Sequence, residues 1–187
     1  MKNLIILSFI FTSSIAFSQK DSVKLAKDWR IKSSLSFAPG FISEKTKTIQ
    51  LQGTVGFLKN KIELRGDGFY FINSFGERPR FSKNHQLFAG AFYKFSEKSF
   101  QPYLGFQAGI AYSQSSEFGA LNFDTQELEY QSTFNPVGSV AGGFDFFGEK
   151  WFYLFTEARY IFGQHKSNTF PVFLDEFRLS FGLGFTF

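Results

Sequence analysis

Three polar residues close to the end of the chain have the types that nucleophilic catalysis requires. His165 and Ser167 lie two positions apart, and Glu176 follows in the next amphipathic segment. A serine with a histidine base that a carboxylate orients is the arrangement used for acyl transfer. These residues form the one candidate catalytic group of the sequence, so a hydrolase is kept as an alternative function. We do not expect enzymatic activity, because one short segment does not define a catalytic site.

A second group consists of charged residues that share the parity of the polar face of their segments. Five are acidic and four are basic: Glu63, Arg65, Asp67, Lys94, Asp145, Glu157, Arg159, Glu176 and Arg178. If these segments enclose a narrow interior, an unpaired charge there costs several kcal/mol, so the two signs must pair across strands. We expect a structural network of ion pairs that plugs the interior. The alternative is a pore for ions or small solutes, which a large single-channel conductance would reveal.

A third group lies in two polar connections and has the composition of a recognition surface. The connection 114–126 and the residues after it are acidic and apolar, whereas the connection 73–83 is basic. The candidate recognition residues are Phe118, Leu121, Phe123, Glu127, Glu129, Arg78 and Arg80. A projecting hairpin with apolar side chains and open backbone groups can add a partner strand, and basic side chains can contact lipid phosphates. We expect surface recognition or adhesion, with an unidentified surface ligand.

The composition argues against several other kinds of site. The 187 residues contain no cysteine, so neither a disulfide nor a thiolate zinc site can form. His85 has no metal-ligand partner at a useful spacing, and the sequence has no glycine-rich phosphate loop. The net charge of +4 is spread along the chain without a basic block of the nucleic-acid-binding type. We therefore expect no cofactor, no metal and no nucleic-acid partner.

The last segment of the chain, 174–187, indicates what kind of element positions these groups. Every second residue is large and apolar, and small or polar residues stand between them: Phe177, Leu179, Phe181, Leu183, Phe185 and Phe187. A period of two predicts a β-strand with one apolar and one polar face. An apolar C-terminal residue would gain little at the fraying end of a soluble sheet. The pattern fits a strand whose apolar face meets lipid and whose polar face meets a narrow lumen.

The same alternation predicts seven further strands. The fold class is therefore an all-β, eight-stranded antiparallel up-and-down transmembrane barrel, with strands at 29–38, 48–58, 62–72, 84–95, 100–113, 127–146, 151–163 and 174–187. The seven connections alternate long and short, as expected for loops on one side and tight turns on the other. Both faces of the strand 84–95 are partly apolar, and Lys94 favours the face with Leu87 outward. Pro136 predicts a bulge or a break, because a closed barrel has no free edge.

The N-terminus predicts export. Lys2 precedes an apolar core, and Ala16-Phe17-Ser18 is a small-x-small cleavage site. We expect a signal peptide, a short periplasmic leader and the barrel at residues 1–18, 19–28 and 29–187. Past the N-terminus no apolar run approaches the ~18 residues of a membrane helix.

The export signal, the eight amphipathic segments and the aromatic C-terminus together resemble the small eight-stranded OmpA/OmpX-like outer-membrane β-barrels, over residues 29–187. In that broad family the barrel-assembly machinery reads a final strand that ends in phenylalanine after alternating apolar residues. The positions that match this assembly signal are Phe181, Leu183, Phe185 and Phe187. The resemblance implies the outer membrane of a Gram-negative-type bacterium, with outer-membrane lipid and the assembly machinery as partners. We expect a monomer.

A narrower resemblance concerns the candidate catalytic group. The segment His165-Lys166-Ser167-Asn168 is similar to the His-x-Ser-Asn segment of the outer-membrane lipid A deacylases, which implies Glu176 as the acid. The Asn-Pro-Gly-type stretch expected next is replaced by Thr169-Phe170-Pro171. In those enzymes the catalytic side chains face the lipid, whereas the alternation here directs Glu176 inward.

A soluble, exported barrel of the lipocalin type is the remaining alternative. Its apolar strand faces would point inward around a ligand, and the charged residues would coat its outside. The long and short connections would then have no reason to alternate. The direction in which the phenylalanine rings point therefore decides between the two folds.

Overall fold

The computed structural model describes residues 29–43, 46–76, 80–117, 119–166 and 170–187. Its long strands are β1 (Arg30–Ser43), β2 (Thr46–Lys59), β3 (Ile62–Gly76), β4 (Phe81–Lys94), β5 (Phe100–Ser115), β8 (Ser132–Phe147), β9 (Phe152–His165) and β11 (Glu176–Thr186). Its short strands are β6 (Ala120–Leu121), β7 (Leu128–Glu129) and β10 (Val172–Phe173). In these ranges no helix is long and apolar enough to cross a membrane. The predicted signal peptide and leader lie outside the described residues.

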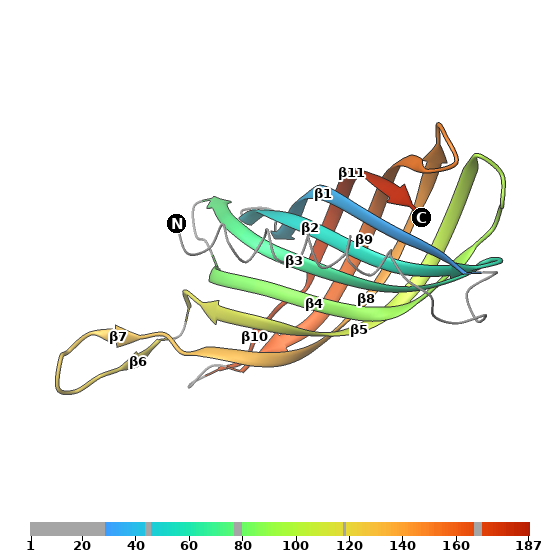
Figure 1. Cartoon of the computed structure of the whole chain (residues 1–187). Helices are drawn as coiled ribbons and strands as arrows, with labels where there is room; N and C mark the ends of the chain where they lie inside the picture. The colour runs from blue at the N-terminus through green and yellow to red at the C-terminus, as the bar shows by residue number, and fades with distance from the viewer. Residues whose placement is uncertain (1–28, 44–45, 77–79, 118, 167–169) are drawn as a thin grey trace, which may run out of the picture.

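The eight long strands close into a barrel (Figure 1). Each pairs antiparallel with its neighbours in chain order, and β1 pairs with both β2 and β11. The end of the chain completes the closure, because Ile31 and Phe187 exchange backbone N–H···O bonds of 3.1 and 2.9 Å. The predicted all-β, eight-stranded antiparallel up-and-down barrel is confirmed.

The outward face of the barrel is apolar. Phe37 and Leu87 expose 64% and 68% of their surface, and the residues on either side of each are buried. A water-soluble barrel would hide these rings, so the lipocalin-type alternative is wrong. In β4 the exposed Leu87 and Tyr93 and the buried Lys94 confirm the predicted faces of that strand.

Aromatic side chains gather toward the two ends of the outward face. At one end Trp151 stacks on Phe185, with ring centroids 5.9 Å apart. Toward the other end Tyr70 lies 4.8 Å from His85, in a tilted arrangement. In β4 the outward positions His85 and Tyr93 are 93 − 85 = 8 residues apart, which is about 27 Å along a strand and about 21 Å after a tilt of about 40°. This height suits the apolar band of a membrane barrel, about 25 Å tall.

The connections differ from the predicted alternation. At the end of the barrel that holds Phe187, here called the turn end, the connections are short, as predicted: 60–61, 95–99 and 148–151. The opposite end is here called the loop end. Most residues of the first two loops predicted there belong to paired strands instead, because β1, β3 and β4 are longer than predicted. The connection 116–131 is the longest one, and it holds β6 and β7 rather than the start of β8.

Two prolines explain where the strands are interrupted. Pro39 pairs with Ile49 of β2, but the ladder between β1 and β11 is interrupted around it. Pro136 lies inside β8, whose register with β5 is unshifted, so the predicted bulge is absent there. The ladder between β8 and β9 begins only at Val137, which is the predicted break. Proline has no backbone N–H, so it cannot donate a hydrogen bond to the strand that this group would face. Only the pairing with that strand is lost at each proline.

Candidate functional site

The lumen holds all nine charged residues that the sequence analysis predicted to face inward, and each of them is buried. Strand alternation positions them, because each stands on an inward-facing position of its strand. They fall into three sets along the barrel axis. The turn-end group contains Glu63, Lys94 and Asp145; the middle group contains Arg65, Asp67, Glu157 and Arg159; and the loop-end pair is Glu176 and Arg178.

Lys32, which the sequence analysis left out of the network, completes the turn-end group. Its Nζ lies 3.1 Å from Glu63 Oε2 and 2.5 Å from Asp145 Oδ2. Lys94 pairs with the same two carboxylates, and its Nζ lies 2.9 Å from Glu63 Oε2. Two lysines and two carboxylates therefore form a neutral group of four. Two features of the sequence could have indicated Lys32. It stands on the polar face of its strand, and a fifth basic residue is needed to balance five acidic ones.

In the middle group two arginines share two carboxylates. Arg65 Nη2 lies 3.1 Å from Asp67 Oδ2 and also donates to Glu157. Arg159 Nη2 lies 2.5 Å from Asp67 Oδ2 and 2.8 Å from Glu157 Oε1. Arg159 Nη1 donates to the buried Gln107. This group is neutral as well, and its hydrogen bonds cross the barrel from β3 to β9.

The loop-end pair is the third neutral set. Arg178 Nη2 lies 2.5 Å from Glu176 Oε2, and Thr48 donates to the same carboxylate. Gly40 of β1 makes room for this carboxylate, because a Cβ at that position would lie 1.9 Å from Glu176 Oε1. Eight strands leave an interior just wide enough for side chains. The arrangement can therefore fill and brace the lumen.

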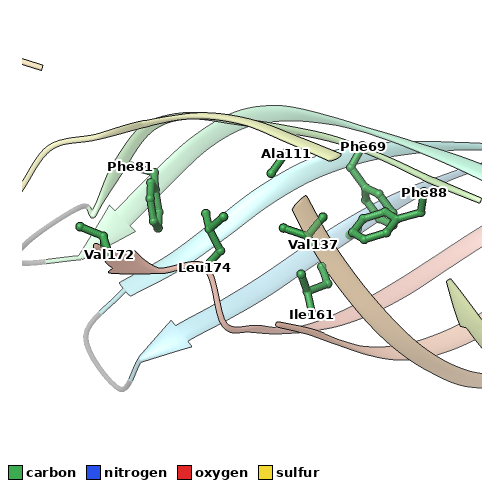
Figure 2. Close-up of a cluster of buried hydrophobic side chains, with 9 residues drawn as sticks. Phe69, Phe81, Phe88, Ala111, Val137, Ile161, Val172 and Leu174 are labelled. Atoms are coloured by element: carbon green, nitrogen blue, oxygen red, sulfur yellow. The ribbon is translucent and has the colours of Figure 1, made fainter. Parts of the chain in front are cut away.

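Toward the loop end the lumen also contains a cluster of apolar side chains (Figure 2), which share this part of the lumen with buried polar residues such as Asn84, Gln86 and His165. The members of this apolar cluster are Ala38, Phe69, Phe81, Phe88, Ala111, Val137, Ile161, Val172 and Leu174. Leu174 is fully buried, and its N–H donates to Gly163 O at 3.0 Å. The chain between β10 and β11 therefore places the Leu174 side chain inside the barrel mouth. The sequence analysis missed this cluster, because it assigned Phe81 and Val172 to loops.

The candidate catalytic residues do not come together in the described part of the chain. His165 is 1% exposed, and its Nδ1 lies 2.9 Å from Ser113 Oγ and 3.2 Å from Thr133 Oγ1. Glu176 is held by Arg178 instead of orienting this histidine. Ser167 lies outside the described residues. Among the residues that the structure covers, no cluster of three His, Asp or Glu side chains has the arrangement of a metal site.

The connection 116–131 forms a hairpin that projects from the loop end (Figure 1). Its strands β6 and β7 pair through Leu121 and Leu128, and Phe123 near the tip is 87% exposed. At its base Arg80 Nε lies 3.7 Å from Glu117 Oε1, so the basic and acidic connections touch. The other recognition candidates in the hairpin, Glu127 and Glu129, are exposed, whereas Arg78 and Phe118 lie outside the described residues.

The closed barrel also occurs in solved structures. Neisserial surface protein A superposes with a TM-score of 0.61 at 19% identity, over 85% of this chain and 97% of that one. The N-terminal β-barrel domain of OprF from Pseudomonas aeruginosa gives 0.57 at 13% identity, over 86% and 98%. The fold is that of the small eight-stranded outer-membrane β-barrels. Ail, the attachment invasion locus protein of Yersinia pestis, gives 0.51 at 13% identity, over 86% and 98%.

These structural similarities establish the fold of the chain, which is that of an outer-membrane barrel. No family model matches the chain, and no curated protein matches it. A membrane barrel has an apolar face toward lipid and a polar interior, as this barrel does. The protein is therefore an integral outer-membrane β-barrel. The assembly-signal residues Phe181, Leu183 and Phe185 face outward on β11, Phe187 directly after it is exposed as well, and their role in assembly stays a prediction.

The orientation follows from the strand count. In an outer-membrane barrel with an even number of strands both chain ends lie on the periplasmic side, where the turns are short. The turn end of this barrel is therefore periplasmic. The hairpin, the residues 170–175 and the apolar cluster then lie toward the cell exterior.

Proposed function

We propose that this barrel is a closed membrane anchor that holds the 116–131 hairpin outside the cell to recognise another macromolecule. The observation that carries the proposal is the hairpin itself, which exposes Leu121, Phe123 and Leu128 to solvent at 50%, 87% and 55%. Exposed apolar clusters on a rigid scaffold are typical of interaction sites. The lumen supports the same role, because its compensated charges and apolar cluster fill the route that a solute would take.

The hairpin is also joined to the barrel in a way that fixes its direction. Gln114 Nε2 donates to Tyr130 O at 2.7 Å, which ties the end of β5 to the strand that returns from the tip. The side chain of Asn122 shapes the tip by accepting the N–H of Asp124 at 2.9 Å. The hydrogen bonds at the base and in the turn order the hairpin before it binds. Binding therefore costs less conformational entropy of the hairpin.

The test is removal of the hairpin from cells that produce the chain. Deleting Ala120–Glu129 joins Gly119 to Tyr130, which already lie close together, since a Cβ on Gly119 would be 3.0 Å from the tyrosine ring. We expect the deleted barrel to reach the outer membrane at normal levels and to keep its heat-modifiable migration in gels. Attachment to protein-coated surfaces or aggregation between cells should fall several-fold. Unchanged attachment and unchanged aggregation would contradict the recognition role.

A further inference from the structure

The turn end carries a group of positive charges beside its first turn, here called the rim group. Arg30 begins β1, Lys59 ends β2, and Lys61 lies in the turn that follows. The backbone places these residues next to one another. Arg30 pairs with Leu58, the residue before Lys59, and Lys59 pairs with Ile62, the residue after Lys61. Two strand ends and one turn therefore bring three cations to one part of the periplasmic rim.

No acidic residue balances the rim group in the part of the chain that the structure describes. Glu63 follows the turn, but it is buried in the lumen and pairs with Lys32 and Lys94. The other two turns at this end each contain one glutamate beside one lysine, so they carry no net charge. Earlier in the sequence, Asp28 follows Lys27, and both lie outside the described residues. The excess of positive charge is therefore confined to the first turn and the start of β1.

The rim group lies where the lipid-facing surface of β2 ends. Val55 and Phe57 are exposed, outward positions of β2, and Lys59 is the next position on that face. Lys59 Nζ lies 5.6 Å from the centre of the Trp29 ring. A lysine at such a boundary lays its stem on apolar surface and keeps its ammonium group in the headgroup region, where tryptophan is enriched as well. Lys59 therefore faces the headgroups of the periplasmic leaflet.

We propose that the rim group, together with Trp29, binds the headgroup of an anionic phospholipid of the periplasmic leaflet. Ammonium and guanidinium groups donate charge-assisted hydrogen bonds to phosphate oxygens, and an anionic lipid surface attracts each of the three cations. A zwitterionic headgroup fits less well, because its own ammonium group would face three cations without an acidic partner. The inference is independent of the recognition role proposed above.

The chain carries its own probe for this site. Its two tryptophans, Trp29 and Trp151, both lie at the turn end, and Trp151→Phe leaves Trp29 as the single reporter. The chain with this change, here called the parent chain, is reconstituted in vesicles of phosphatidylcholine with increasing fractions of phosphatidylglycerol. One of the two lipids is brominated on its acyl chains. Bromine quenches tryptophan fluorescence only over short distances, so the quenching gives the ratio of the two lipid binding constants beside Trp29.

Two double variants of the parent chain separate the site from the overall charge. Lys59→Gln/Lys61→Gln removes two cations of the rim group, and heat-modifiable gel migration checks that the barrel still folds. The matched control is Lys47→Gln/Lys83→Gln, which removes the same charge from two exposed positions at the loop end. A single change, Lys59→Arg, keeps the charge of the site.

We expect the parent chain to bind phosphatidylglycerol at least about threefold more tightly than phosphatidylcholine beside Trp29. This ratio should fall to about one with Lys59→Gln/Lys61→Gln and stay near the parent value with the loop-end pair and with Lys59→Arg. A ratio of about one in the parent chain, or an equal fall in both double variants, would overturn the site. Loss of the preference on addition of glycerol phosphate would assign the site to a soluble phosphate and overturn the lipid assignment.

Discussion

Single side chains decide whether the lumen is electrically neutral. Glu63 and Asp145 both contact Lys32 and Lys94, so each carboxylate has two cations and each cation has two carboxylates. Removing one lysine leaves two buried negative charges facing one positive charge. In a low-dielectric interior such an excess is costly, whereas removing a charge of each sign restores the balance.

We expect Lys32→Met to lower the free energy of unfolding by about 3 kcal/mol. The double variant Lys32→Met/Glu63→Gln should recover more than half of that loss, because Lys94 and Asp145 remain as a pair. Urea unfolding in lipid vesicles, followed by heat-modifiable gel migration, measures both. Lys98→Met, in an exposed turn, is the control and should stay within about 0.5 kcal/mol of wild type. A double variant no more stable than Lys32→Met would contradict compensation as the reason for the pairing.

At the scale of elements, the period-two pattern of single strands predicted most of the barrel. It placed Leu87 outward and Lys94 inward, because a bilayer and a narrow lumen impose opposite polarity on alternate residues. It could not predict that β1 continues through Pro39, since that depends on pairing with β2 and a missing ladder beside β11. Nor did it find the apolar cluster, because Leu174 is buried only when its connection lies inside the barrel mouth.

The connection before β11 offers a test with adjacent residues. We expect Leu174→Ala to cost about 2–5 kcal/mol, because it removes a fully buried side chain from the apolar cluster. Phe173→Ala, at an outward position that is 57% exposed, should stay within about 0.5 kcal/mol of wild type. Urea unfolding measures the difference, and protease cleavage in the connection 166–175 should increase only for Leu174→Ala. Equal effects of the two variants would show that the connection does not pack into the mouth.

The whole molecule combines a filled lumen with a projecting hairpin, to which we assign the proposed recognition role. Three neutral ion sets follow one another along the lumen, and the apolar cluster lies toward the exterior end, where Phe69 contacts Arg159 and Arg178. The outward face anchors the barrel in the membrane, and the proposed recognition role lies at the loop end. This arrangement predicts that transport and recognition can be separated experimentally.

In planar bilayers we expect the purified chain to show no large, steady open level, because the neutral ion sets and the apolar cluster occupy the lumen. The hairpin-deleted chain should behave in the same way, since the hairpin lies outside the lumen. Single-channel recordings with a known open porin as the positive control make the comparison. A large and lasting conductance in both proteins would show that the lumen is a pore.

The separate neutrality of each ion set has a consequence for electrical behaviour. A potential difference across the bilayer pulls on Lys32 and Lys94 as strongly as it pulls on Glu63 and Asp145 in the reverse direction, and the same cancellation holds for the arginine sets. Each set therefore has no net charge, so a membrane potential exerts no net force that would move a whole set along the barrel axis. The barrel should remain shut when the Donnan potential of the cell envelope changes.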